Sequence, residues 1–296
     1  MKVLLAGGTG FLGSALVRAL RQRGHGVTVL SRTPKGPGEA LWSADGSDAS
    51  LQARVDGADA VINLAGSSIA AGRWTQARKN AILSSRVNAT RALANAITAA
   101  PHPPPVFFSG SAIGYYGVQG DAPLDETSPA GADFLAGVCV EWEASAMAAS
   151  GHSRVVLLRT GLVLDRNGGA LPPIARPFRW GVGGPLGSGR QYMSWIYLHD
   201  WVGLVLWALE RDSIVGPLNL TAPSPVTNHE FSRVLANELH RPAVFRAPAP
   251  ALRLILGEMA DALLLGGQRV LPRKAEAEGF TFRFDRLSPV LHALYG

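Results

Sequence analysis

The sequence predicts an α/β fold in which a parallel sheet carries helices on both faces, with a smaller C-terminal α+β domain. Strand-like and helix-like segments alternate over the first 165 residues, and a glycine-rich turn joins the first strand to the first helix. After residue 165 the alternation gives way to a stretch rich in glycine and proline. Alternating strands and helices build βαβ units, whose right-handed crossovers bring the carboxyl ends of the strands to one edge.

Apolar periodicity places the individual elements. Strands are predicted over residues 2–5, 26–30, 59–64, 106–109 and 155–158, and helices over 11–23, 75–100 and 136–149. The strand segments are short and almost continuously apolar, as expected for strands buried on both faces. Residues 166–191 predict a long loop without regular structure, and such loops are usually functional.

The last part of the chain, from Thr227, predicts a smaller helical unit. One apolar stripe at helical spacing favours a helix that faces the core over one that lies on a membrane; it comprises Leu252, Ile255, Leu256, Met259, Leu263 and Leu264. We therefore expect two domains. Residues 1–165 and about 190–225 form the sheet domain, and about 166–189 and 226–296 form the substrate-side domain.

Composition excludes several classes of protein. The chain has 296 residues, a net charge of +6 and one cysteine, Cys139. A single cysteine excludes an intrachain disulfide and a multi-cysteine metal site, and we predict no metal site and a cytoplasmic location. The cations are interleaved with acids, which argues against nucleic acid as a partner, and no apolar stretch is long enough to span a membrane.

The glycine-rich turn is the most specific motif. It occupies residues 6–13, directly after the first predicted strand. Glycines at these positions permit a sharp turn, close approach of the backbone to a pyrophosphate, and packing of the helix on the strand, while the helix N-terminus attracts the anion. The residues predicted to bind a dinucleotide here are Gly7, Thr9, Gly10, Phe11, Leu12 and Gly13.

The end of the second strand indicates which dinucleotide. NAD sites usually carry an acid there for the ribose 2′-hydroxyl, whereas an arginine accommodates a 2′-phosphate. This strand ends at Ser31 and Arg32, and the next acid is Glu39. The planar, permanently charged guanidinium of Arg32 and the hydroxyl of Ser31 therefore predict NADP.

Motifs along the whole chain resemble those of an extended short-chain dehydrogenase/reductase. More narrowly, the chain resembles the atypical epimerase-family branch that carries a C-terminal domain of uncharacterised function. The segments that carry this resemblance are the glycine loop, residues 59–66, 73–79, 85–87, 109–117, 133–135, 141–143, 183–189, 197–201, 264–272 and 279–280.

The resemblance implies a Rossmann-like domain with NADP laid across the strand ends. Backbone at Leu64, Ala65 and Gly66 would line the adenosine side. Arg86 matches an arginine that this branch has where other relatives keep a catalytic-site asparagine, which implies that it faces the cofactor. Gly161, Leu162 and Val163 lie where relatives cover the nicotinamide.

The catalytic residues depart from the wider family, whose members combine a serine with Tyr-x-x-x-Lys. Ser111 matches the serine, but Leu135 and Cys139 stand at the tyrosine and lysine positions, as is typical of the atypical branch. Leucine cannot carry a proton, so the usual proton relay cannot be transferred to this chain. Tyr115 and Tyr116 are candidate substitutes, and the alternative for both is packing.

Three other candidates are weaker. A lone buried cysteine such as Cys139 is more often an inert small hydrophobe than an activated thiol. Glu141 and Glu143 are two residues apart on one helix, so at most one of them enters the pocket. His199 and Asp200 resemble a catalytic pair in which the aspartate supports a histidine acting as general base. In this family, however, the motif begins a structural helix.

The loop from 172 to 195 is predicted to line the substrate pocket. Its cations suit anionic groups and its tryptophans suit a ring or sugar face; the residues are Arg176, Arg179, Trp180, Arg190 and Trp195. We hypothesise an NADP-dependent oxidoreductase or epimerase acting on a small polar molecule, with a sugar nucleotide as one candidate. The alternative is an NADP-occupied sensor without turnover, and the sequence leaves open whether the chain forms a homodimer.

Overall fold

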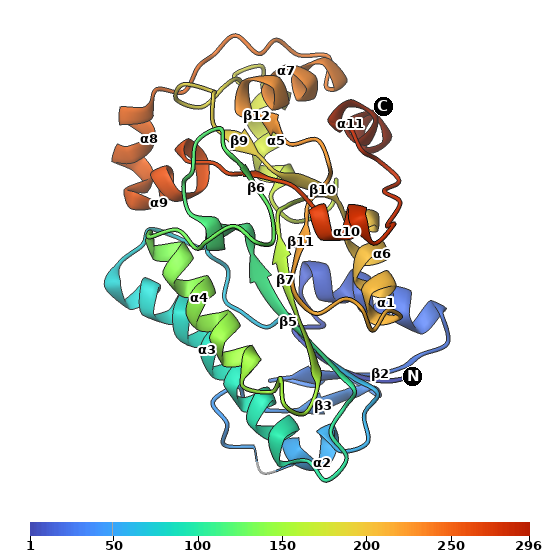
Figure 1. Ribbon diagram of the computed structural model, residues 1–296. Helices are drawn as coiled ribbons and strands as arrows, with labels where there is room; N and C mark the ends of the chain where they lie inside the picture. Colours follow the sequence, from blue (N-terminus) through green and yellow to red (C-terminus); the bar gives the residue numbers. More distant parts are fainter. Residues whose placement is uncertain (49) are drawn as a thin grey trace.

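The computed structural model describes residues 1–48 and 50–296, with a seven-stranded sheet at its centre (Figure 1). The strand order is β11-β7-β5-β4-β1-β2-β3, and every neighbouring pair is parallel. The strands are β1 (Lys2–Ala6), β2 (Gly26–Ser31), β3 (Glu39–Leu41), β4 (Ala60–Asn63), β5 (Val106–Ala112), β7 (Arg154–Thr160) and β11 (Gly216–Leu220).

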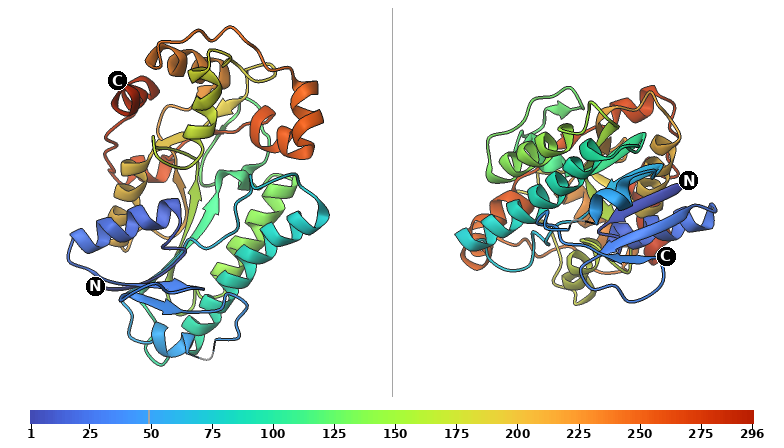
Figure 2. Two further views of the ribbon diagram at one scale, coloured as in Figure 1. Left: turned by 180° about the vertical axis from the view of Figure 1, so that it is seen from behind. Right: turned by 90° about the horizontal axis from the view of Figure 1, so that it is seen from below.

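Helices cover both faces of this sheet, which confirms the predicted fold class. One face carries α1 (Phe11–Gln22) and α6 (Leu198–Leu209), which contact each other. The other carries α2 (Leu51–Val55), α3 (Gln76–Ala99) and α4 (Phe134–Met147), with α3 and α4 side by side in Figures 1 and 2.

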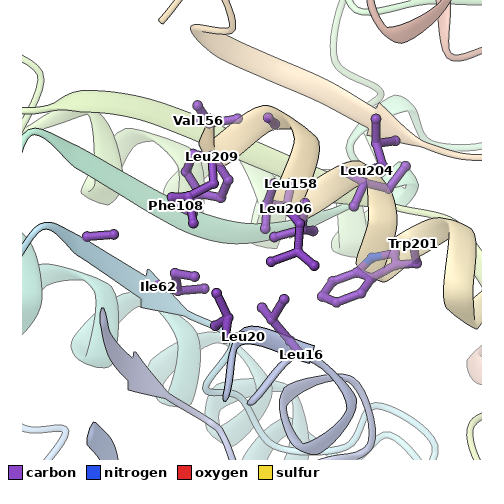
Figure 3. Close-up of a cluster of buried hydrophobic side chains, with 14 of the residues drawn as sticks. Leu16, Leu20, Ile62, Phe108, Val156, Leu158, Trp201, Leu204, Leu206 and Leu209 are labelled. Carbon is purple, nitrogen blue, oxygen red and sulfur yellow. The ribbon is translucent and has the colours of Figure 1, made fainter. Parts of the chain in front are cut away.

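The core between the sheet and the α1–α6 layer is apolar and fully enclosed (Figure 3). Leu16 and Leu20 of α1 meet Ile62 and Phe108 from the central strands, and all four side chains are completely buried. Alternate residues of β1 supply both faces, since Val3 and Leu5 pack under α1 whereas Leu4 and Ala6 pack under α3. The strand ends are thereby fixed between two rigid helical layers.

The smaller part of the molecule has a third core, formed by α5, α7 and α11 around two short strand pairs. The two strand pairs of this core are β8 (Leu162–Leu164) with β10 (Trp195–Tyr197), and β9 (Tyr192–Met193) with β12 (Val226–Thr227). A further pair joins β6 (Pro123–Leu124) to β13 (Arg269–Val270). The remaining helices are α5 (Leu171–Arg179), α7 (Asn228–Glu238), α8 (Ala249–Leu256), α9 (Glu258–Ala260), α10 (Arg273–Ala277) and α11 (Leu287–Tyr295), of which α10 packs against β11 with Ala275 in the core of the main sheet. A 3₁₀ turn, η1, spans Ile113–Tyr116, and a π-helical turn, η2, spans Asp261–Leu265.

The prediction that residues 166–191 lack regular structure is wrong for part of the segment. Helix α5 lies inside it and buries Leu171, Ala175 and Phe178 in the third core. Prolines at the start of α5 conceal the helix in the sequence, although proline is well suited to the first turn, where its missing N–H has no intrahelical partner.

The prediction of one core-facing helix over 252–264 is wrong in part. Of the stripe residues, Met259 is buried, Ile255 is 66% exposed, and the other four are partly buried. Gly257, at φ +63°, ends α8, so the apolar stripe is divided among α8, α9 and η2. In the described ranges no helix combines the length and apolar character needed to cross a bilayer.

Candidate functional site

The glycine loop between β1 and α1 folds tightly against two neighbouring backbone segments. Gly7 has φ +81°, and a Cβ there would lie 2.6 Å from the carbonyl carbon of Leu64. A Cβ on Gly13 would lie 2.1 Å from the carbonyl oxygen of Gly7. Both distances are far inside van der Waals contact, so the loop closes over the end of β4 only because these residues are glycines.

The N-terminus of α1 has the chemistry of an anion site. Its N-cap, Gly10, offers no side chain, and the first turn carries no acid. The N–H groups of Phe11, Leu12 and Gly13 precede the point at which intrahelical bonding begins. They point along the helix axis with the positive end of its dipole, which fits a pyrophosphate.

The ends of β2 and β4 form two walls beside this loop. Ser31 is buried and its hydroxyl accepts a hydrogen bond from Thr33 N at 3.2 Å. Arg32 is exposed and makes no hydrogen bond or ion pair with any residue in the described ranges. After β4, Ala65 N donates to Asn63 Oδ1 at 3.0 Å, which fixes the direction of the 64–66 backbone.

Arg86 projects from α3 against the 64–67 segment. Its Nη1 donates to the carbonyl oxygens of Ser67 and Ile82 at 3.0 Å each, and its guanidinium lies 5.2 Å from the Trp142 ring centre. A Cβ on Gly66 would lie 3.2 Å from the guanidinium carbon. Burial lowers the pKa of Arg86 from its ordinary value. The structure therefore brings a desolvated cation to the segment predicted to line the cofactor.

The segment after β7 closes the same edge of the sheet. Gly161 follows the strand directly, and Leu162 N donates to the Ser194 carbonyl oxygen at 2.8 Å. Further along, a Cβ on Gly168 would lie 2.4 Å from the Phe11 ring. The loop after β8 thus contacts the first helical residue beyond the glycine turn.

A buried ion pair anchors the proposed catalytic serine. Arg159 of β7 donates Nε to Glu143 Oε1 and Nη2 to Glu143 Oε2, both at 2.8 Å. Ser111 Oγ of β5 donates to the same Oε1 at 2.6 Å. Ser111, Glu143 and Arg159 are 4%, 6% and 2% exposed. The bidentate geometry explains how two charges are tolerated in the interior.

The interpretation of Tyr116 as a proton donor needs correction. Its side chain is completely buried, its hydroxyl donates to Asn219 Oδ1 at 2.7 Å, and it accepts from Arg159 Nη1 at 3.0 Å. Burial raises the pKa of Tyr116 to about 12. Tyr115 stacks on Arg159, whose guanidinium carbon lies 3.4 Å from the ring centre. Both tyrosines therefore have packing roles in the structure, which is the alternative that the sequence analysis left open for them.

The positions that carry Tyr and Lys in the wider family do face the serine end of β5. A Cβ on Gly114, three residues after Ser111, would lie 3.4 Å from Leu135 Cβ and 3.9 Å from Cys139 Sγ. Cys139 is 4% exposed, and burial raises the pKa of its thiol to about 12. Leucine has no ionisable proton and the thiol of Cys139 stays protonated at neutral pH, which agrees with an inert cysteine.

The acidic candidates separate as expected. Glu141 is exposed whereas Glu143 is buried, so one carboxylate of the pair enters the interior. Asp200, in the first turn of α6, accepts the backbone N–H groups of Arg283 and Phe284 at 2.8 and 3.1 Å. Asp200 holds the C-terminal segment against the sheet domain, which is a structural role.

The predicted substrate-side residues do not gather in one place. Trp195 is completely buried in the third core with its Nε1 donating to Ser224 O at 3.0 Å, so it cannot stack on a ligand. Trp180 is 66% exposed, and Arg176 lies over its ring at 4.6 Å. Arg179 lies over Tyr295 at 5.4 Å, and Arg190 is exposed. The prediction assumed that all five residues lie on one loop, whereas helix α5 divides this segment.

Sequence reasoning missed Arg159 and Asn219, which complete the buried network. Asn219 of β11 also donates Nδ2 to Leu271 O at 2.9 Å, linking the sheet edge to the C-terminal segment. The available signal was polarity inside two otherwise apolar strands, since an arginine and an asparagine there need buried partners.

Removing the carboxylate of Glu143 will destabilise the fold. Glu143→Ala leaves the buried guanidinium of Arg159 unpaired, and we expect the free energy of unfolding to fall by about 3–5 kcal/mol. Glu143→Gln retains hydrogen-bonding atoms and will cost less. Urea denaturation measures both, with the exposed Glu141→Ala as the matched control, expected within about 0.5 kcal/mol of the parent. Equal losses at positions 141 and 143 would contradict the network.

Cys139 will resist alkylation while the chain is folded. A thiol pKa raised to about 12 keeps the sulfur protonated at pH 8, and burial removes access. Iodoacetamide labelling should therefore be at least ~100-fold slower in the native protein than in urea, since each pKa unit is about tenfold in thiolate fraction. Mass spectrometry reads one site, because the chain has one cysteine. Rapid native labelling at pH 8 would restore the activated-thiol interpretation.

Comparison with known proteins gives the family. The pattern of the NAD dependent epimerase/dehydratase family matches residues 3–220, and that of a domain of unknown function, DUF1731, matches residues 247–294. The epimerase family protein SDR39U1 of Bos taurus is 40% identical over 295 residues, covering 98% of each chain.

Two solved structures have a similar fold over the whole chain. Human SDR39U1 (isoform2), crystallised with NADPH, has a TM-score of 0.93 and 38% identity, covering 100% of this chain and 99% of that one. The nucleoside-diphosphate sugar epimerase from Corynebacterium glutamicum has a TM-score of 0.82 and 32% identity, covering 100% of this chain and 58% of that one. The chain therefore belongs to the NAD dependent epimerase/dehydratase family and ends in a DUF1731 domain.

Proposed function

We propose that this protein is an NADP-dependent oxidoreductase or epimerase that acts on a small polar molecule. The observation that carries the proposal is the glycine loop folded at the uncapped N-terminus of α1, beside a β2 end that carries Arg32 and no acid. The crystallisation of the human relative with NADPH supports the choice of nucleotide.

NADP, when bound, supplies hydride transfer at its nicotinamide. The residues proposed to hold it surround the carboxyl ends of the strands. The α1 N-terminus receives the pyrophosphate, Arg32 the 2′-phosphate, and the 64–66 backbone the adenosine side. Arg86 and the 161–163 segment are proposed to face the nicotinamide half.

Ser111 is proposed to orient the reacting oxygen of the substrate. Because its hydroxyl proton is donated to Glu143 at 2.6 Å, its lone pairs remain available toward a ligand. A substrate hydroxyl is a donor and matches those lone pairs. This polarity favours a substrate that carries an alcohol at the reacting carbon.

The printed function of the Corynebacterium glutamicum relative supports a nucleoside-diphosphate sugar as one candidate substrate. If the hydride returns to the substrate within one turnover the result is epimerisation, and otherwise the protein is a reductase or dehydrogenase. The absence of a titratable pair at Leu135 and Cys139 favours the alternative, an NADP-occupied sensor without turnover.

The enzyme and the sensor differ in what a second ligand does. A screen of sugar nucleotides and small hydroxy compounds against the NADP⁺-loaded protein, and of the corresponding carbonyl compounds against the NADPH-loaded protein, should find one that changes nicotinamide fluorescence and is chemically converted. Product analysis by mass spectrometry separates turnover from binding. Binding without conversion across the screen would favour the sensor.

Reversing the charge at Arg32 will change nucleotide preference. Arg32→Asp places a carboxylate where the 2′-phosphate is proposed to bind, so we expect NADPH affinity to fall by about 100-fold or more and NADH affinity to change little. Fluorescence titration measures both constants. Because Arg32 is exposed, the melting temperature of the apo protein should not change. An equal loss for both nucleotides would refute the assignment of Arg32.

A further inference from the structure

A cavity of about 640 Å³ opens beside the glycine loop, between α1 and the segment that joins β2 to β3. Thr9 of the glycine loop lies at one side, Ser14 and Arg18 of α1 form one wall, and Pro37 and Glu39 form part of the other. The cavity therefore begins at the predicted pyrophosphate site and extends along the outer face of α1.

One cation in this cavity has no partner among the residues that the structure describes. Arg21 donates Nη2 to the Val27 carbonyl oxygen at 3.3 Å, and the Glu39 carboxylate accepts from Lys35 N at 3.0 Å. Arg18 is exposed and forms neither a hydrogen bond nor an ion pair in the described ranges. Ser14, one helical turn earlier, lies on the same face. A free guanidinium in a concave site is suited to an anion.

The position of the cavity points to a phosphate of the proposed nucleotide. A dinucleotide with its pyrophosphate at the α1 N-terminus places its adenosine ribose at the end of the second strand, where the 2′-substituent is read. Arg32 is at that strand end, and the residues that follow it lead to the cavity wall at Pro37. We propose that Arg18 is a second anchor for the 2′-phosphate of NADP, contributed by α1, so that the phosphate binds between Arg18 and Arg32.

This inference rests on the proposed NADP binding and deepens it. A phosphate dianion has enough acceptor oxygens for two guanidinium groups, whereas the 2′-hydroxyl of NAD gives neither arginine a counter-charge. Arg18 would therefore discriminate between the nucleotides without affecting the pyrophosphate or nicotinamide contacts.

Fluorescence titration with NADPH and NADH tests the proposal. Arg18→Ala should weaken NADPH binding by about 10- to 100-fold and leave NADH binding within about twofold, since the lost contact is a charge-assisted hydrogen bond. Arg18→Lys keeps the positive charge but lacks the planar guanidinium, so its NADPH affinity should lie between those of the parent and of Arg18→Ala. Arg91→Ala is the matched control. Arg91 is an exposed arginine on helix α3, and its replacement by alanine also removes one positive charge.

The outcomes distinguish this proposal from the proposed function. If the parent prefers NADPH and Arg18→Ala keeps that preference, the role of Arg18 is refuted while NADP binding stands. A loss shared equally by NADPH and NADH, or by Arg91→Ala, also refutes it. If the parent binds neither nucleotide, both proposals fail.

Discussion

The buried pair of Glu143 and Arg159 is the interaction on which the arrangement of the site depends. Its charges are almost completely removed from water, so the desolvation cost is large. It is offset by the two 2.8 Å hydrogen bonds between the groups, by the bonds from Ser111 and to Tyr116, and by the Tyr115 ring stacked on Arg159. These bonds fix α4, β5 and β7 relative to one another. A shift of any of these elements would leave a charge unpaired, which makes the geometry around Ser111 stiff.

The same network reaches the C-terminal part of the chain. The Tyr116 hydroxyl donates a hydrogen bond to Asn219 Oδ1, and the backbone N–H of Asn219 donates to Glu126 Oε1 at 3.0 Å. Glu126 Oε2 accepts the backbone N–H of Lys274 at 3.2 Å. Burial raises the pKa of Glu126 from its ordinary value, which marks it as another group that depends on these partners. The C-terminal segment is therefore held to the strand ends by polar bonds that lie inside the protein.

The sequence predicted the parts of the fold that local physics determines. The glycine loop, β1, α1, α3 and the apolar strands have periodicity and turn chemistry that depend on neighbours in the chain. Strands β3 and β11 were not predicted; β3 has three residues and β11 carries glycine, proline and asparagine. Their stability comes from parallel pairing with β2 and β7, which one sequence does not reveal.

The candidate site also has one part that depends on neighbours in the chain and another that depends on contacts between distant residues. The proposed cofactor half rests on a motif of consecutive residues, so the sequence alone was enough to propose it. The partners of Ser111 could not be identified in this way, because Glu143 and Arg159 are 32 and 48 positions away in sequence. Their charges were visible, but their burial was not.

The two halves of the site also differ in what their chemistry permits. Cations and free N–H groups at α1 and β2 suit anions and can bind without moving a proton. At the β5 end, Leu135 and Cys139 replace the expected relay, and the hydroxyl proton of Ser111 is already directed at Glu143. Under the proposed function, a proton that leaves a substrate hydroxyl there would meet a hydrogen-bond network whose acceptor, Glu143, is already paired with Arg159. Under the proposed function, catalysis at this site would therefore require either a relay through that network or a proton acceptor supplied by the substrate or by water.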